Sequence, residues 1–351
     1  MKKITVLLCL TIQFINAQSI LPPVQEWQGK SENLIAKATN PWITPTEKSD
    51  FLTTPTYDET MSWFKKLVDA SPLLKMVSIG KSLEGREIYM VIASTEKNVD
   101  ASALKKSQKP NLLVQAGIHS GEIDGKDAGM MLLRDIAFGG KKELLDKVNF
   151  LFIPILSVDG HERSSVYNRP NQRGPENMGW RTNAQNLNLN RDYAKLDTQE
   201  IRAVVKVIND YNPSLYIDLH VTDGADYQYD ITYDFGDNNS YSPLCESWLS
   251  KIFKPTVDQD LQINGHIPGP FLNAASNFGF SEGNISFKGS PRYSADYGDL
   301  RHLPSILVEN HSLKPYKQRV FAVCVCCAVV AITQYNIAIS KLLRWGLCVT
   351  G

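Results

Sequence analysis

The sequence lacks a surplus of either charge. Lysine and arginine together number 37, as do aspartate and glutamate, so the formal net charge is zero. Proteins that bind nucleic acid usually carry a basic surplus gathered on one face, and this balance gives no indication of one. The chain is otherwise globular in composition, with 43% hydrophobic and 21% charged residues. We therefore expect no nucleic-acid partner, while small or neutral substrates remain open.

Apolar runs long enough to cross a bilayer as a permanent helix are also lacking. The apolar stretch Thr5–Ile15 follows two lysines at positions 2 and 3 and precedes the small residue Ala17. This layout is typical of a secretory signal peptide, and a buried N-terminal helix or strand is the alternative. We predict a signal peptide at 1–17, a secreted or periplasmic location and no integral membrane span.

Cysteines are few and badly placed for a disulfide framework. A chain of 351 residues does not need bridges to fold. Cys9 lies in the predicted signal peptide and Cys245 stands alone. The spacing of the others inside an apolar run lacks the turn of a zinc knuckle. We expect buried thiols, in a helix packed against a sheet or in an atypical tail; the cysteines concerned are Cys324, Cys326, Cys327 and Cys348.

Apolar periodicity predicts helices and strands that alternate through the centre of the chain. Such alternation is typical of a mostly parallel sheet covered on both faces. Helices are expected at Tyr57–Ala70, Ile123–Phe138, Thr198–Asp210 and Tyr241–Phe253. Strands are expected at Lys75–Ile79, Glu87–Ser94, Asn111–Ala116, Asn149–Leu156, Ser214–Leu219 and Pro304–Val308.

No internal repeat or low-complexity tract divides the chain. After the signal peptide we expect an extended segment at 18–55, one large domain at 56–340 and a C-terminal tail at 341–351. The polar stretch at 159–197, rich in Asn, Arg and Gly, is too long for a simple connector. Loops of this length in compact domains are usually functional or disordered.

Potential metal ligands follow two of the predicted strands. His119 and Glu122 come after Asn111–Ala116, and His220 comes at the end of Ser214–Leu219. The carboxyl ends of parallel strands meet at one edge of an open sheet, where ligand sites form. Two imidazoles and one carboxylate suit catalytic zinc, which makes a bound water acidic enough to attack at neutral pH. Taken singly, each histidine could be an ordinary surface or core residue, and His-x-x-Glu is common by chance. Together they predict one Zn²⁺ per chain.

Glu309 follows four apolar residues of a predicted strand. A carboxylate there is unfavourable unless it faces a cleft, where it could act as a general base toward a water. An ion pair with Lys314 or Lys317 is the alternative.

Two arginines, Arg181 and Arg191, lie in the Asn-rich loop between the metal motifs. Guanidinium groups can clamp a carboxylate bidentately or stabilise a developing oxyanion. Loop arginines are more often solvated, so neither residue alone would indicate a site.

Taken in order, these motifs resemble the M14 family of zinc carboxypeptidases. The similarity runs from about residue 55 to 320, with family-like separations. The matching stretches are His119-Ser120-Gly121-Glu122, Val158-Asp159-Gly160, Trp180-Arg181, Asn190-Arg191, Leu219-His220 and Leu307-Val308-Glu309.

The resemblance implies a three-layer α/β/α sandwich around a mixed, mostly parallel sheet, with residues 56–340 as the catalytic domain. It implies zinc on His119, Glu122 and His220, and Glu309 as the group that promotes attack by water. By the same resemblance, Arg181 polarises the scissile carbonyl, and Asn190 and Arg191 hold the C-terminal carboxylate of a peptide substrate. A mobile tyrosine closes over the substrate in this family; the candidates are Tyr293, which we prefer, and Tyr297.

Two departures from the family pattern stand out. Asn188 occupies a position where many members have an acidic residue that orients a zinc-bound imidazole. The Cys-rich end also fits poorly with the amphipathic helix that usually closes the domain. Side-chain preference is not readable, although acidic residues at the start of the stretch 223–290 could favour basic substrates or form a solvated loop; they are Asp223, Asp226 and Asp230.

Three functions remain open. A secreted metallocarboxypeptidase, expected to be a monomer, is the first prediction, and the Asn190-Arg191 carboxylate clamp favours it. A related zinc amidohydrolase, such as a deacylase or cell-wall peptide amidase, would act without a substrate carboxylate. A non-catalytic binding protein on the same scaffold would have lost Glu309 or a metal ligand, and neither is replaced.

Overall fold

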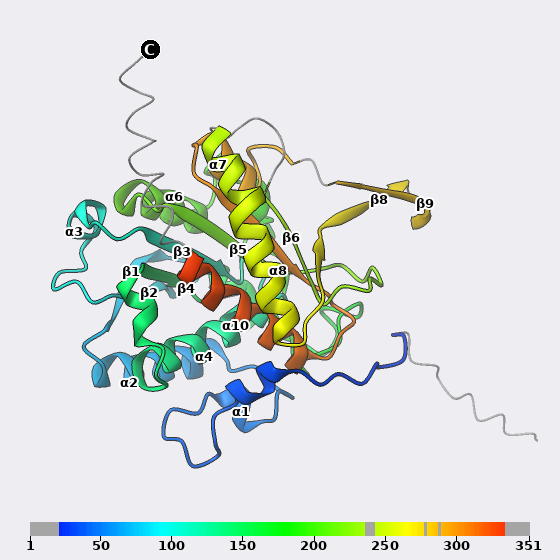
Figure 1. The fold of residues 1–351 in the computed structure, drawn as a ribbon, viewed down its shortest axis with the longest axis horizontal. Helices are drawn as coiled ribbons and strands as arrows, with labels where there is room; N and C mark the ends of the chain where they lie inside the picture. The colour runs from blue at the N-terminus through cyan, green and yellow to red at the C-terminus, as the bar shows by residue number, and fades with distance from the viewer. Residues whose placement is uncertain (1–20, 236–242, 277–278, 287–288, 334–351) are drawn as a thin grey trace, which may run out of the picture.

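A computed structural model describes residues 21–235, 243–276, 279–286 and 289–333, and Figure 1 shows their arrangement. The predicted signal peptide at 1–17 and the tail at 341–351 lie outside the described residues. Within the described part of the chain, no helix is both long and apolar enough to cross a membrane.

One eight-stranded sheet forms the centre of the molecule. Its strands are β1 (Leu74–Lys81), β2 (Glu87–Ala93), β3 (Asn111–Ala116), β4 (Asn149–Ile153), β5 (Leu215–Val221), β6 (Ile231–Asp234), β7 (Pro268–Pro270) and β10 (Ser305–Asn310). They lie in the order β1-β2-β4-β3-β5-β10-β6-β7. The central strands β4, β3, β5 and β10 are all parallel, and antiparallel pairs flank them at β1-β2, β2-β4 and β10-β6. Because helices cover both faces, β3, β4 and β5 are buried along their whole length.

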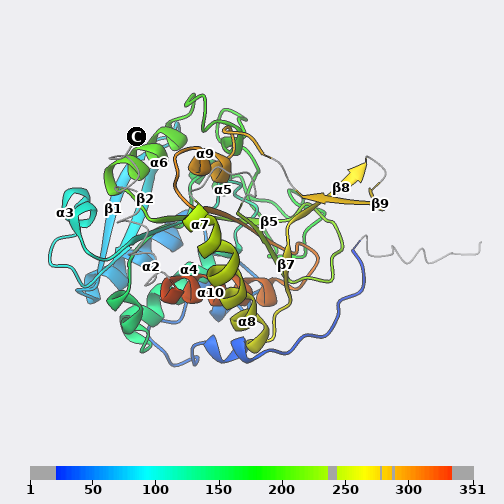
Figure 2. The same cartoon turned by 45° about the horizontal axis from the view of Figure 1, so that its top comes forward.

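Helices cover the two faces of this sheet, as Figure 2 shows for α6 and α9 above it and α4 and α10 below it. The first face carries α3 (Ala101–Lys106), α5 (Val158–Glu162), α6 (Gln199–Tyr211) and α9 (Ser294–Leu300). The second carries α2 (Tyr57–Ala70), α4 (Asp124–Phe138), α7 (Pro243–Trp248), the π-helical segment η4 (Leu249–Phe253), α8 (Lys254–Ile263) and α10 (Tyr316–Thr333). A separate apolar core fills each interface. The predicted three-layer α/β/α sandwich with a mixed, mostly parallel sheet is confirmed.

Local sequence signals explain why several elements match their predicted ranges. Helix α2 spans the predicted residues, because Thr56 and Glu59 form a capping box at its start. Helix α6 begins after the N-cap Thr198 and ends at Asn212, whose left-handed backbone stops it. Most of the elements that were not predicted are short or exposed: α3, α5, α9, η2 (Lys142–Asp146), η3 (Leu189–Arg191), β6, β7 and the hairpin of β8 (Leu272–Ser276) and β9 (Gly279–Ser286). Helix α8 was not predicted either; it follows η4 directly, where the helix expected at 241–253 was predicted to end.

Helix α10 accounts for the apolar C-terminal run. Its side chains are buried between α4 and α8, so an amphipathic pattern is not needed. The expectation of buried thiols is confirmed for Cys324, Cys326 and Cys327, which are free and at most 3% exposed. Burial raises the pKa of Cys324 to about 11 and of Cys326 to about 12, so these thiols stay protonated.

The segment 21–55 is more structured than the extended lead-in that was predicted. It contains η1 (Lys30–Leu34) and α1 (Pro45–Lys48) and runs along the outside of the second helical layer (Figure 1). Glu47 there accepts two hydrogen bonds from the buried Arg134 of α4, both at 2.6 Å. Trp27 stacks on His266, with ring centroids 5.0 Å apart. We call this segment the strap.

The strap should loosen in acid because of His266, which is 1% exposed. Its Nε2 lies 2.8 Å from Ser31 Oγ in the strap. Burial lowers the pKa of His266 from 6.5 to about 4, so the folded state binds a proton less readily than the unfolded chain. Stability from this group is therefore complete above pH 6.5 and falls as the pH drops toward 4, by about 2 kcal/mol between pH 7 and 4.5.

Urea unfolding of the wild type and of His266→Gln at these two pH values tests this. The variant, which keeps a hydrogen-bonding partner for Ser31 but cannot titrate, should lose about 2 kcal/mol less on acidification. Equal losses in the two proteins would contradict the assignment.

Candidate functional site

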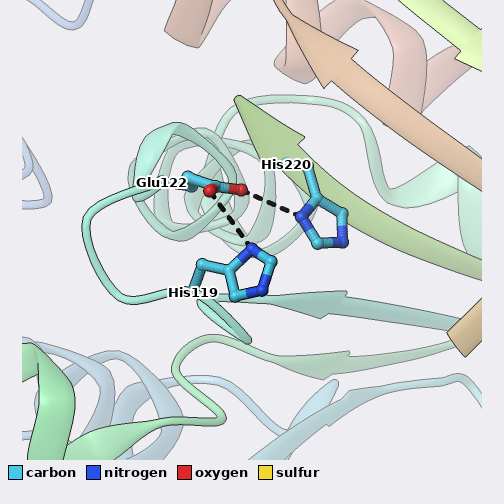
Figure 3. A group of neighbouring side chains, drawn as sticks. All are labelled: His119, Glu122 and His220. Atoms are coloured by element: carbon cyan, nitrogen blue, oxygen red, sulfur yellow. Dashed lines mark hydrogen bonds and ion pairs between the residues drawn. The ribbon is translucent and has the colours of Figure 1, made fainter. Parts of the chain in front are cut away.

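The three predicted metal ligands come together at the carboxyl edge of the sheet. His119 and Glu122 lie in the turn between β3 and α4, and His220 lies near the end of β5 (Figure 3). Strands β3 and β5 are parallel neighbours, so their carboxyl ends bring the two motifs side by side. Strand β5 continues to Val221, so His220 lies within the strand rather than after the predicted end at Leu219.

The geometry of the cluster fits a metal ion. One ligand atom from each of the three residues lies within 4.8 Å of the others, and all three residues are buried. Nδ1 of His119 lies 3.1 Å from Glu122 Oε1, and Nδ1 of His220 lies 2.9 Å from Glu122 Oε2. The buried His119 Nδ1 has no hydrogen-bond partner among the described residues. A buried ring nitrogen without such a bond, facing a carboxylate and a second imidazole, is suited to ligate zinc.

A hydrogen bond at Nε2 orients each imidazole. His119 Nε2 lies 2.9 Å from Asn188 Oδ1, which also accepts a hydrogen bond from the Asn190 amide. His220 Nε2 lies 2.8 Å from Asp218 Oδ2. With Nε2 donating in both rings, the neutral form of each imidazole has its Nδ1 lone pair available for a metal. The amide of Asn188 therefore fills the position that the acidic residue of the family pattern would take.

The three potential ligands shift one another's pKa values. Burial lowers the pKa of His119, which favours the neutral ring that a metal requires. Burial acts in the same direction on His220, but the charges of Asp218 and Glu122 outweigh it and hold the pKa of His220 well above its ordinary value. Burial would raise the pKa of Glu122, yet His119 and Arg169 hold it well below. Metal binding must therefore displace a proton from His220, so affinity should fall in acid.

Glu309 lies beside the cluster on the next strand. It is in register with His220, and neighbouring strands are about 4.8 Å apart. Burial raises the pKa of Glu309 to about 8, and the charge of Glu122 adds to this effect. The two lysines considered as ion-pair partners are engaged elsewhere, Lys314 with Asp230 and Lys317 with Asp50. The alternative of a lysine-paired Glu309 is therefore wrong.

Arg181, Asn190 and Arg191 reach the same region from the long polar loop. Arg181 Nη1 lies 3.0 Å from Glu122 Oε1. Asn190 is buried, and its Oδ1 accepts a hydrogen bond of 2.8 Å from the Ser294 amide. The Arg191 guanidinium is half-buried and donates to the Asn190 carbonyl at 2.6 Å. Burial lowers the pKa of Arg191, and the nearby positive charge of Arg181 contributes to the same effect.

A cavity of about 170 Å³ connects these groups. Its wall includes the three potential ligands, Glu309, the two arginines, Asn190 and Tyr293. The Arg191 guanidinium lies over the Tyr293 ring, with its Cζ 4.1 Å from the ring centroid. Tyr297 does not belong to this wall: its ring packs 5.5 Å from that of Tyr193, and its hydroxyl accepts a hydrogen bond from Arg301.

Sequence reasoning missed three parts of the site. Asp218 had a usable signal, because residues two apart on a strand share a face and His220 follows it by two. Arg169, buried against Glu122, gave no signal that distinguishes it from other loop arginines. The third part is the far wall of the cavity, which comes from β6, β8, α9 and the residue before β8, none of them predicted, and includes Asp234, Phe271, Asn273, Asp296 and Asp299.

The acidic loop residues considered for substrate preference are placed differently. Asp223 is exposed at the cavity and lies 3.3 Å from Arg169 Nη2. Asp226 lies 3.4 Å from His311, and Asp230 is buried near Lys314, both away from the cavity wall. His311 Nε2 also accepts a hydrogen bond of 2.7 Å from the Tyr227 amide.

Replacing the residue behind His119 should change metal affinity. In Asn188→Asp, the carboxylate would raise the basicity of the His119 ring and strengthen zinc binding by about tenfold. In Asn188→Leu, loss of the acceptor should weaken binding by roughly 10- to 100-fold. Competition with a chromogenic chelator measures both values, and similar affinities for the two variants would contradict the role assigned to Asn188.

Solved structures with a similar fold include metallocarboxypeptidases. The carboxypeptidase A of Helicoverpa armigera superposes with a TM-score of 0.59 at 17% identity, covering 87% of this chain and 80% of that one. A metallo-carboxypeptidase from Burkholderia cenocepacia gives a TM-score of 0.58 at 14% identity, covering 80% of this chain and 69% of that one. At these identities the similarity establishes the fold.

Curated relatives are similar over part of their length. Carboxypeptidase 2 of Trichophyton rubrum is 28% identical over 187 residues, which is 52% of this chain and 31% of the relative. The catalytic chain of human carboxypeptidase N is 22% identical over 215 residues, 51% of this chain and 44% of the relative. The chain thus spans less than half of the length of these relatives.

The family itself follows from a longer match. The model of the Peptidase_M14 family, zinc carboxypeptidase, matches residues 60–263, more than half of the 351 residues. The matched range includes all three residues of the buried His-Glu-His cluster. The chain therefore belongs to the zinc carboxypeptidase family of metallopeptidases.

Proposed function

We propose that this protein is an exported zinc metallocarboxypeptidase that hydrolyses the C-terminal peptide bond of peptides. The observation that carries the proposal is one cavity that holds both the His119, Glu122 and His220 cluster and the Arg191 guanidinium. A positive group at a short distance from a hydrolytic centre selects substrates by a terminal carboxylate. Export is supported by the signal-like sequence at 1–17, which lies outside the described residues.

His119, Glu122 and His220 would hold one zinc ion. When bound, zinc acts as a Lewis acid and lowers the pKa of water so that it attacks at neutral pH. The protein residues then have separate roles. Glu309 accepts the proton of the attacking water and returns it to the leaving amine, and its raised pKa of about 8 suits proton exchange near neutrality. Positive charge from a divalent ion would act against this rise.

Arg181 and the Asn190-Arg191 pair would bind the two oxygen-bearing groups of the substrate. The Arg181 side chain is 33% exposed, so it can turn from Glu122 to the scissile carbonyl and stabilise the developing oxyanion. Arg191 would hold the terminal carboxylate, with Asn190 fixed in place by the Ser294 amide. Tyr293, against Arg191, is the better placed of the two tyrosine candidates to cover a bound substrate.

A zinc amidohydrolase remains the alternative. The two functions differ in whether cleavage requires a free C-terminal carboxylate on the substrate. We expect one zinc per chain and cleavage of blocked dipeptides as free acids, with at least about 100-fold slower cleavage of the matching C-terminal amides, because a charged pair to Arg191 is lost. Metal analysis and amine release measure both quantities on the chain from residue 18 onward.

Two variants serve as controls. Arg191→Met should abolish the preference for the acid, while Glu309→Gln should keep zinc and lose roughly 10²- to 10⁴-fold in kcat on every substrate. Equal cleavage of acid and amide by the wild type would favour the amidohydrolase. Zinc binding without turnover would favour a binding protein, and a folded sample that takes up no zinc would refute the metal site.

The far wall of the cavity supports a preference for cationic C-terminal side chains. Asp234, Asp296 and Asp299 all line it. Burial raises the pKa of Asp296 to about 6 and of Asp299 to about 8, and the charge of Asp234 adds to both shifts. A cationic side chain beside these carboxylates would favour their ionised forms, which supports binding of a cation over an apolar group.

Blocked dipeptides that end in lysine, leucine or glutamate test this preference. Lysine should exceed leucine in kcat/KM by about tenfold or more at pH 7.5, and glutamate should be poorest. The double variant Asp234→Asn/Asp299→Asn should bring lysine and leucine within about threefold while leaving cleavage of the leucine substrate nearly unchanged. A wild type that prefers leucine or glutamate would overturn the proposal.

A further inference from the structure

Arg169 is a buried cation beside the metal cluster that the proposed mechanism does not use. It comes from the loop between α5 and η3, and 5% of its side chain is exposed. Its Nη1 donates to Glu122 Oε1 at 3.0 Å, and its Nη2 lies 3.4 Å from the carbonyl oxygen of Val221. Arg169 therefore connects the β3–α4 turn, which carries two potential ligands, to the end of β5, which carries the third.

The surrounding residues hold Arg169 in this orientation. Gln172 accepts a hydrogen bond from Arg169 Nε at 3.1 Å and donates one to the Gly121 carbonyl at 2.9 Å. The loop packs so closely that a Cβ at position 121 would lie 2.8 Å from Arg169 Cγ and 2.7 Å from the Gly179 carbonyl oxygen. Glycine between Ser120 and Glu122 is thus what lets the arginine lie against the ligand turn.

Two arginines share one oxygen of Glu122. Arg169 and Arg181 both place Nη1 at 3.0 Å from Oε1. They differ in exposure, since the Arg181 side chain is 33% exposed and that of Arg169 is 5% exposed. Only Arg181 can therefore swing into the cavity without a rearrangement of the loop. When it does so, Arg169 still supplies a charge-assisted hydrogen bond to the buried carboxylate.

We propose that Arg169 is a positioning residue that fixes the Glu122 carboxylate for the metal and so frees Arg181 to act on the substrate. This inference rests on the proposed zinc site at His119, Glu122 and His220. A ligating carboxylate depends on its own hydrogen-bond donors for orientation, and loss of such a donor usually weakens metal binding by about 10- to 100-fold. Arginine suits the position because its planar fork reaches two acceptors at once.

Zinc affinity measured by chelator competition tests the proposal independently of catalysis. Arg169→Met should weaken zinc binding by about 10- to 100-fold. The matched control is Arg173→Met in the same loop, because Arg173 donates to the carbonyl oxygens of Leu313 and Pro22 and touches no ligand. This control should stay within about threefold of the wild type, as should Arg181→Met, whose kcat should fall by about 10²-fold or more.

Thermal unfolding of the metal-free proteins separates positioning from folding. A merely structural Arg169 would lower the unfolding midpoint of the metal-free protein and leave the zinc affinity of the folded fraction unchanged, which would overturn the proposal. Equal loss of zinc affinity in Arg169→Met and Arg181→Met would also overturn it, since the two arginines would then be equivalent.

If Arg169→Met does not fold, zinc affinity is measured on Arg169→Lys instead. An ammonium group cannot reach Glu122 and Val221 together, so zinc binding should weaken by at least about threefold, and unchanged affinity would refute the proposal. A wild type that binds no zinc would instead refute the metal site itself, which distinguishes failure of the proposed function from failure of this inference.

Discussion

The arrangement of the site depends on compensating one buried carboxylate, that of Glu122. Removing a carboxylate from water is unfavourable by several kcal/mol unless charge and hydrogen bonds replace the solvent. Here two imidazoles, two guanidinium groups and the Val221 amide surround it. These groups come from the ends of β3 and β5 and from the long polar loop. Compensation of one buried carboxylate therefore brings three distant segments of the chain together. Arg169 and Arg181 attach the loop to this carboxylate, while Leu189 and Tyr193 of the same loop pack in the apolar core of the first face.

This dependence explains which parts of the molecule could be predicted from the sequence. Strand β3 and helix α2 have the predicted bounds, because an apolar strand and a capping box are local signals. The ligand set at the strand ends follows from the same local patterns together with sheet topology. Arg169 was missed because its role arises from a contact 47 residues away along the chain, and no spacing rule indicates such a contact. Asp218 was missed although its position two residues before His220 carried a signal.

Elements whose character is set by tertiary contacts were the hardest to interpret. The apolar run of α10 gave no amphipathic period, because α4 and α8 bury it from both sides. The wall formed by β6 and the segment near β8 was missed because β6 has only four residues and β8 is short and partly exposed. The same wall carries Asp234, Asp296 and Asp299, so the carboxylates on which the proposed substrate preference rests lie in the part of the fold that was hardest to predict.

The strap has a consequence for how the chain is made. Phe51 in the strap lies against Phe321 of α10, with ring centroids 5.1 Å apart, and Trp27 lies 6.1 Å from the same ring. Phe51 therefore meets this aromatic partner only when synthesis has passed residue 321, and Trp27, which also stacks on His266, completes its packing at the same point. Until then the apolar surface of α4 lacks its cover, and the emerging polypeptide cannot close its second core. The second core therefore closes only after helix α10 has been synthesised, although α4 and the strap that it covers are complete nearly 200 residues earlier.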